Sequence, residues 1–177
     1  MKHKGTKTLK TERLVLRKIK TSDYKDVFRY ASKEDVSKYV TWDKHTDPEI
    51  SKKLCRHWKN QYIHKSTYRW AIEYNSRVIG CIDVVVLYEQ KAVLGWCIDS
   101  EFWNKGIVTE AAAAVRDYLL NDVGFEAIEA AHIKENIGSG RVMQKIGMKQ
   151  IPYEKTVYYK IGKNLDADIL DFYSISK

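Results

Sequence analysis

The 177 residues are enough for one domain with a substantial core, and a hydrophobic fraction of 44% with five Trp and twelve Tyr excludes a disordered chain. Three cysteines without paired spacing favour reduced thiols over a disulfide framework or a zinc site. The sequence holds no apolar run long enough to cross a bilayer and no apolar signal core, so we expect a cytoplasmic protein with neither a membrane partner nor a metal.

The formal net charge of +8 has three interpretations: a nucleic-acid or ribosomal partner, attraction of an anionic ligand, or solubility. Solubility fits best, because the lysines are scattered along the chain. Direct reading of nucleic acid is disfavoured, since no basic stripe carries interleaved aromatic residues. The one local concentration of lysines lies in residues 1–10, which we expect to form a loosely ordered basic arm.

The first half of the chain predicts one strand, then helices, then a meander of strands. Apolar and charged side chains alternate over 11–19 and predict the first strand. Helices are predicted from periodicity and start signals over 21–31, 33–39 and 48–64. Asp47-Pro48-Glu49 marks the start of the last, with Pro near the first turn and two acids at the positive end of the helix. Strands are predicted over 68–74, 77–87 and 92–98. Asn75–Ser76 separates the first two of these strands and indicates the tight turn of an antiparallel hairpin.

The second half predicts a crossover followed by a closing hairpin. An alanine-rich helix ends near Gly124, and a strand over 127–133 follows, so this strand is expected to run parallel to strand 92–98. A short helix over 138–148 precedes two further strands, predicted over 149–160 and 167–176 with a turn at 162–164. The fold class is therefore α/β (α+β): a single domain, 1–177, with a mixed, mostly antiparallel sheet of about seven strands and helices on both faces.

The segment between strand 92–98 and the alanine-rich helix is the strongest functional signal. A strand runs into a short loop that contains Gly106, and the loop opens directly into the helix. Several backbone N–H groups without helical partners and the positive end of the helix dipole therefore meet at one point. Such a point is a cradle for phosphate groups.

This segment resembles the acyl-CoA loop of the GNAT N-acetyltransferase superfamily, Gln/Arg-x-x-Gly-x-Gly/Ala, with Trp103, Gly106 and Val108 at its defined positions. Its run from Trp103 to Ala111 is similar to Trp-Gly-Lys-Gly-Tyr-Ala-Thr-Glu-Ala of the ribosomal-protein N-terminal (RimJ/RimL-type) branch. Asn104 replaces a glycine there, and Asn tolerates a left-handed backbone better than most residues. Residues 136–148 resemble the same branch's Asn-x-x-Ser-x-Arg/Lys-Val-x-x-Lys-x-Gly-Phe element, one helix and one strand downstream.

The resemblance implies a GNAT-like fold and the transfer of an acetyl group from acetyl-CoA, without a metal, to an amine. The amides of residues 104–109 are expected to hold the pyrophosphate, with added charge from Lys105, and the edge of strand 96–98 to pair with the pantetheine arm. The implied cofactor-binding residues are Trp96, Cys97, Ile98, Trp103, Asn104, Lys105, Gly106, Ile107, Val108, Thr109, Asn136, Ser139 and Arg141.

Ser139 is the candidate proton donor to the CoA thiolate, the other interpretation being an N-cap for the helix that follows. The general base is open, because relatives often carry an acid at the position of Val93. Asp83, Glu129 and His132 are the replacements, each of which also has a structural interpretation. A covalent acetyl-enzyme on Cys97 is a further alternative, disfavoured against a buried inert thiol.

The expected acceptor is a protein N-terminus such as that of a ribosomal protein. Tyr39 and Trp42, with Tyr158 and Tyr159, are the candidates for lining its pocket, although such aromatics are usually core residues. Two alternatives stay open: a small-molecule amine, such as a polyamine, a drug or an amino-acid derivative, and a non-catalytic acyl-CoA-binding module. The oligomeric state is left as a monomer or a homodimer.

Overall fold

A computed structural model describes residues 2–163 and 165–177. Met1 of the predicted arm and Asn164 of the predicted 162–164 turn lie outside the described residues. Contacts divide the chain into two compact units, which we describe separately. Unit A comprises residues 3–83 and 96–111, and unit B comprises residues 84–95 and 112–177 together with Lys2.

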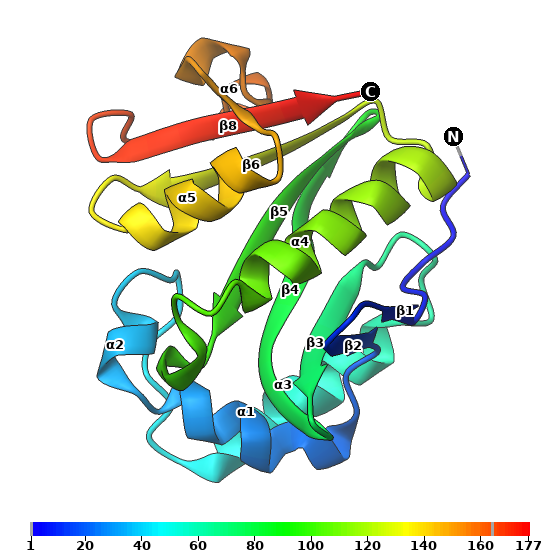
Figure 1. The fold of residues 1–177 in the computed structure, drawn as a ribbon, viewed down its shortest axis with the longest axis vertical. Coiled ribbons are helices and arrows are strands. Elements are labelled where there is room, and N and C mark those ends of the chain that lie inside the picture. Colours follow the sequence, from blue (N-terminus) through cyan, green and yellow to red (C-terminus); the bar gives the residue numbers. More distant parts are fainter. Residues whose placement is uncertain (1, 164) are drawn as a thin grey trace. The chain divides into compact units, whose positions relative to one another are not determined.

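Unit A combines antiparallel strands with helices (Figure 1). Its strands are β1 (Leu9–Lys10), β2 (Leu14–Arg17), β3 (Arg69–Tyr74) and the first part of β4 (Arg77–Tyr88), and each pairs antiparallel with the next. Its helices are η1 (Thr21–Asp23), α1 (Tyr24–Ala31), α2 (Glu34–Ser37) and α3 (Pro48–Gln61). Asp47 caps α3 by accepting a hydrogen bond from Glu49 N, as the Asp-Pro signal predicts.

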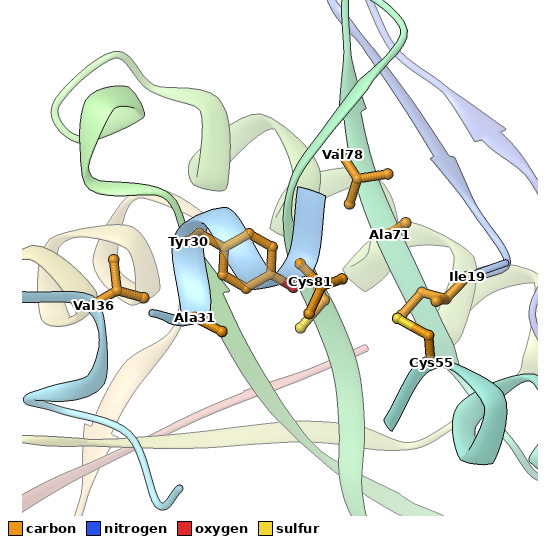
Figure 2. Packing of buried hydrophobic residues seen from close by; sticks show 9 residues of the cluster. Ile19, Tyr30, Ala31, Val36, Cys55, Ala71, Val78 and Cys81 are labelled. Carbon is orange, nitrogen blue, oxygen red and sulfur yellow. The ribbon is translucent and has the colours of Figure 1, made fainter. Parts of the chain in front are cut away.

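The core of unit A packs α1, α2 and α3 against β3 and β4. Figure 2 shows Tyr30 of α1 directed toward Cys81 of β4, with Cys55 of α3 beside Ile19. All four side chains are buried. Burial raises the pKa of the Cys55 thiol to about 12, so this cysteine is an apolar packing residue, as expected.

The hairpin between β3 and β4 is confirmed. Asn75 and Ser76 both have positive φ angles, 47° and 61°, the pattern that a two-residue turn needs to match the twist of its strands.

Unit B contains the end of β4, the first part of β5 (Lys91–Ile98), and the chain from residue 112, within α4, onward. Its strands are β6 (Ala127–Ile133), β7 (Lys149–Ile151) and β8 (Leu170–Ser176), and its helices are most of α4 (Ile107–Asp117), then η3 (Tyr118–Val123), α5 (Ile137–Lys145), η4 (Tyr153–Lys155) and α6 (Val157–Lys160). β5 pairs parallel with β6, as the predicted crossover requires, and β8 pairs antiparallel with both β6 and β7. Gly124 ends η3 with a φ of 94°.

The strands follow the hydrogen-bonded order β1-β2-β3-β4-β5-β6-β8-β7. The predicted mixed, mostly antiparallel α/β sheet is confirmed, with eight strands in the part of the chain that the structure describes where about seven were expected.

The additional strand arises because the basic N-terminal segment is not a loose arm. Leu9–Lys10 pairs with β2, and Trp70 Nε1 donates to the carbonyl of Lys7 at 2.6 Å. The hydroxyl of Thr6 both donates to Thr67 O and accepts from Arg69 N. Backbone and side-chain hydrogen bonds thus fix residues whose composition alone indicates a frayed terminus.

The predicted strand over 149–160 is also wrong beyond its first three residues. Only Lys149–Ile151 is strand; Pro152 ends the ladder, and η4 and α6 follow. Thr156 caps α6 by accepting from Tyr159 N.

Gly80 offers a test of packing on β4. An added Cβ would lie 2.3 Å from the carbonyl oxygen of Cys97 and 2.9 Å from Cα of Ile98, which are backbone atoms that cannot rotate away. We expect Gly80→Ala to lower the free energy of unfolding by about 2–3 kcal/mol in urea titrations. Gly138→Ala, whose Cβ meets only Asn136 Oδ1 at 3.6 Å, is the control and should be neutral or stabilising by up to about 1 kcal/mol. Equal stability of the two variants would contradict the prediction.

Candidate functional site

The loop before α4 has the backbone of an anion cradle. It follows β5 through η2 (Ser100–Phe102) and contains two residues in the left-handed region, Asn104 with a φ of 60° and Gly106 with a φ of 73°. Left-handed residues in such a loop help to turn neighbouring N–H groups toward one side, as phosphate-binding loops require. The left-handed conformation that the sequence allowed for Asn104 is therefore present.

Six successive backbone N–H groups, from Asn104 to Thr109, have no hydrogen-bond acceptor among the described residues. The flanking amides are paired: Trp103 N donates to Ser100 O, and Glu110 N donates to Gly106 O. An added Cβ on Gly106 would meet only a guanidinium nitrogen of Arg13, at 3.5 Å. The loop therefore offers donors and open space to a phosphate ligand.

Arg13 and Glu110 fasten this loop to the N-terminal segment. Glu110 accepts from the hydroxyl of Thr11, from Arg13 N at 2.9 Å and from Arg13 Nε at 2.6 Å. Arg13 Nη1 donates to the carbonyl of Lys105 at 3.0 Å. Burial opposes the charge on Glu110, but these hydrogen bonds outweigh it and lower the pKa of the carboxyl. Neither residue was found from the sequence, because 97 positions separate the partners.

Asp99 anchors the beginning of the loop. Its side chain is 2% exposed and accepts from Lys33 Nζ at 2.6 Å, and its backbone N–H donates to Ile79 O. Burial opposes the charge on Lys33, but its hydrogen bonds to Asp99 and Glu101 raise the pKa of the ammonium above the ordinary value. Sequence reasoning missed this anchor as well, since nothing near Asp99 indicates its partner.

The predicted cofactor strand residues lie just before the loop. Trp96 and Cys97 are half-buried and Ile98 is buried. Trp103 is 41% exposed, and its Nε1 donates to Ile98 O. Cys97 Sγ lies 3.5 Å from Cys81 Sγ, and both thiols are free. Lys105 Nζ lies over the ring of Phe102 at 5.4 Å, beside the free amides.

Asp83 forms a cross-strand ion pair. It lies directly opposite Arg69 on β3, whose Nε and Nη2 approach the carboxylate at 2.9 and 2.8 Å. Arg69 in turn donates to Gln61 and stacks on Trp58. Burial raises the pKa of Asp83, and Arg69 opposes that rise. Both N–H groups contact the same carboxylate oxygen, Oδ2, so Asp83 already has a structural partner.

One of the two proposed acceptor residues of unit A, Trp42, borders a shallow depression of about 580 Å³. Trp42 lines it together with Lys38, Lys44, Glu34 and Asp43, among others. Trp42 also packs against the core, and its ring lies 5.5 Å from that of His45. Tyr39 is half-buried, with Lys38 Nζ over its ring at 4.8 Å.

Unit B brings together the second set of candidates at the start of α5. Asn136, not Ser139, caps this helix: its Oδ1 accepts from Ser139 N at 3.3 Å. The N-cap interpretation of Ser139 is therefore wrong. Its hydroxyl is half-buried and has no hydrogen-bond partner among the described residues. Arg141 is exposed one turn further along.

His132 lies against the same helix. Its Nδ1 is 2.8 Å from the carbonyl of Ile133, which fixes the proton on Nδ1 in the neutral ring and leaves a lone pair on Nε2. Nε2 is buried without a hydrogen-bond partner, 4.0 Å from Asp171. A Cβ on Gly140 would lie 2.7 Å from Nε2, so the glycine makes room for the ring.

Glu129 and the tyrosines of α6 have structural partners. Glu129 lies beside Val93 in the parallel ladder but accepts from Val157 N at 2.7 Å and pairs with Lys91 at 3.3 Å. Tyr158 packs on Phe172, and burial raises the pKa of its hydroxyl. Tyr159 is 53% exposed.

No group of three or more His, Cys, Asp or Glu side chains among the described residues is arranged to hold a metal ion. None of the helices built from residues 2–163 and 165–177 is long and apolar enough to cross a bilayer.

Comparisons with known proteins agree with this geometry. The model of the acetyltransferase (GNAT) domain matches residues 13–149. The chain is 27% identical over 173 residues to the uncharacterized N-acetyltransferase YoaA of Bacillus subtilis (strain 168), covering 96% of each. A GNAT-family acetyltransferase structure from Bacillus anthracis has a TM-score of 0.77 at 26% identity, covering 96% of this chain and 98% of that one. RimL, a ribosomal L7/L12 α-N-protein acetyltransferase solved with coenzyme A, has a TM-score of 0.78 at 14% identity, covering 96% and 98%. The chain therefore belongs to the GNAT acetyltransferase family, whose enzymes take the transferred acetyl group from acetyl-CoA.

Proposed function

We propose that this enzyme transfers the acetyl group of acetyl-CoA to the α-amine of a protein N-terminus, such as that of a ribosomal protein. The observation that carries the cofactor part of the proposal is the row of six unpaired amides from Asn104 to Thr109. These donors and Lys105 hold the pyrophosphate, and the backbone of strand residues 96–98 pairs with the pantetheine amides. Asn136, Ser139 and Arg141 complete the cofactor site, and the two units act as one cytoplasmic acetyltransferase domain, as a monomer or a homodimer.

The reaction needs a neutral amine, a polarised thioester carbonyl and a proton for the leaving thiolate. The amine nitrogen attacks the carbonyl carbon, the C–S bond breaks, and CoA leaves as a thiol. Ser139 donates the proton to the sulfur and regains one from a water molecule, because its hydroxyl lies on the first turn of α5 and has no partner among the described residues.

His132 is the preferred base. Its Nε2 carries a free lone pair and accepts the ammonium proton directly or through a water molecule, whereas the carboxylate of Asp83 is held by two N–H groups of Arg69. Glu129 is disfavoured more strongly than Asp83, since both of its oxygens accept hydrogen bonds, whereas Arg69 contacts one oxygen of Asp83.

A peptide acceptor fits the chain better than a polycation. A net charge of +8 repels polyamines and aminoglycoside-like drugs. The depression beside Trp42 is shallow and has charges of both signs, which suits an extended peptide more than a small cation. Membership in a family of transferases favours catalysis over a non-catalytic acyl-CoA-binding module.

The acceptor is tested by measuring thiol release from acetyl-CoA in the presence of ribosomal-protein N-terminal peptides, polyamines, drugs and amino-acid derivatives. We expect amine-dependent release with at least one peptide and little release with polyamines. Efficient turnover of a small amine alone would replace the peptide acceptor, and binding of acetyl-CoA without release for any amine would favour the non-catalytic module.

Ser139→Ala tests the proton donor. We expect kcat to fall about 100-fold, the lower end of the usual contribution of a general acid, while KM for acetyl-CoA changes little. The melting temperature should not change, because the hydroxyl has no partner to lose. Ser32→Ala is the control; Ser32 Oγ donates to the backbone of α1 and lies outside the lining of the Trp42 depression, so kcat should stay at the wild-type value. A kcat for Ser139→Ala within threefold of wild type would exclude the role.

His132→Gln and Asp83→Asn separate the two candidate bases. We expect His132→Gln to lower kcat/KM about 100-fold and to remove the fall in kcat/KM at acid pH that protonation of a base causes. Asp83→Asn should instead lower the melting temperature, because Arg69 loses its charged partner, and leave the pH profile unchanged. The opposite pattern would assign the base to Asp83.

A further inference from the structure

We infer that Arg13 and Glu110 are positioning residues that aim the pyrophosphate-binding amides, so that they contribute to affinity for CoA without contacting it. The inference rests on the proposed cofactor site. It concerns a pair of residues that the sequence motifs leave without a role: the arginine that precedes β2 and the acid in the first turn of α4.

The contacts of this pair are more extensive than those of an ordinary surface ion pair. One oxygen of Glu110 accepts from the Thr11 hydroxyl and from Arg13 N, and the other accepts from Arg13 Nε. The guanidinium then reaches past the carboxylate to the carbonyl of Lys105. The side chains are 38% and 18% exposed, so the cluster lies at the surface, where the free amides are.

Planarity of the peptide bond connects this contact to the ligand. In a trans peptide the C=O and the following N–H point in opposite directions. When Arg13 holds the carbonyl of Lys105, it therefore fixes the direction of the Gly106 N–H on the opposite side of the same peptide plane. Gly106 is in the left-handed region, where the peptide would otherwise rotate most freely.

Charge gives the pair a second effect. A carboxylate in the first turn of α4 is stabilised by the helix dipole, but it would repel a bound diphosphate. Arg13 pairs with Glu110 and offsets its negative charge, and the same guanidinium donates to the carbonyl of Lys105. The loop is thereby held by an acid without exposing an unbalanced negative charge to the ligand.

The test compares two ligands, CoA and pantetheine, which lacks the pyrophosphate and nucleotide. The readout is the ratio of their dissociation constants, Kd(pantetheine)/Kd(CoA), by titration calorimetry on the full chain. Arg13→Lys keeps the charge but cannot bond both partners, and Glu110→Gln keeps the shape but loses the charge. We expect each to lower the ratio about tenfold, the effect of one charge-assisted hydrogen bond, with Kd for pantetheine unchanged.

The same ratio is measured for two control variants and for one milder variant. Arg29→Lys and Glu49→Gln alter the exposed pairs with Asp26 and Lys52 and should leave the ratio unchanged. Thr11→Val removes one of the three hydrogen bonds to Glu110 and should lower the ratio about two- to threefold, so it tests the inference if a stronger variant does not fold.

The outcomes separate this inference from the proposed site. If wild type binds CoA no better than pantetheine, the pyrophosphate cradle itself is wrong. If wild type prefers CoA and the variants keep that preference, or lose both ligands equally, the positioning role is overturned and the pair is purely structural.

Discussion

The site depends on a backbone constraint: six consecutive amides, Asn104 to Thr109, must stay unpaired within the chain yet remain in fixed directions. Unpaired N–H groups are tolerated only where solvent or a ligand reaches them, and Asn104 and Gly106 are exposed. The two left-handed residues prevent the loop from continuing α4 backwards, which would pair these amides with carbonyls. A ligand with several oxyanions then replaces water as their acceptor.

A loop whose central amides have no acceptor among the described residues has to be held from outside. Asp99 holds its beginning through Lys33, and Glu110 holds its end through Thr11 and Arg13. Asp99 is almost completely buried and is paired with both Lys33 and Arg77, so these ion pairs contribute to folding, whereas the exposed Arg13 pair contributes less. This difference indicates a division of roles: the buried pair fixes where the loop starts, and the surface pair adjusts its direction.

Features that depend on residues close together in the sequence could be predicted, and features that depend on distant residues could not. Signals within a few residues predicted the Asn75–Ser76 turn, the Asp47 cap and the loop-to-helix junction at Gly106, because each depends on local φ angles or local hydrogen bonds. Contacts between distant residues gave no signal. The pairing of Leu9–Lys10, at the end of the predicted arm, with β2 was missed for this reason, and so was the Arg13–Glu110 pair. The prediction of a strand over 149–160 was wrong for a local reason: Pro152 has no N–H to donate to the ladder and ends the strand.

The register of β6 explains why Glu129, the acid beside Val93, need not be the base. Successive side chains of a strand point to opposite faces, so Glu129 and His132 lie on different faces of β6. Glu129 meets α6 through Val157 N, while His132 meets α5 at Gly140, and Figure 1 shows the two helices on opposite sides of β6 and β8. The free hydroxyl of Ser139 is on α5 as well. The α5 face therefore carries both an unpaired proton donor and an unpaired acceptor, and the α6 face has its carboxylate committed to holding the fold.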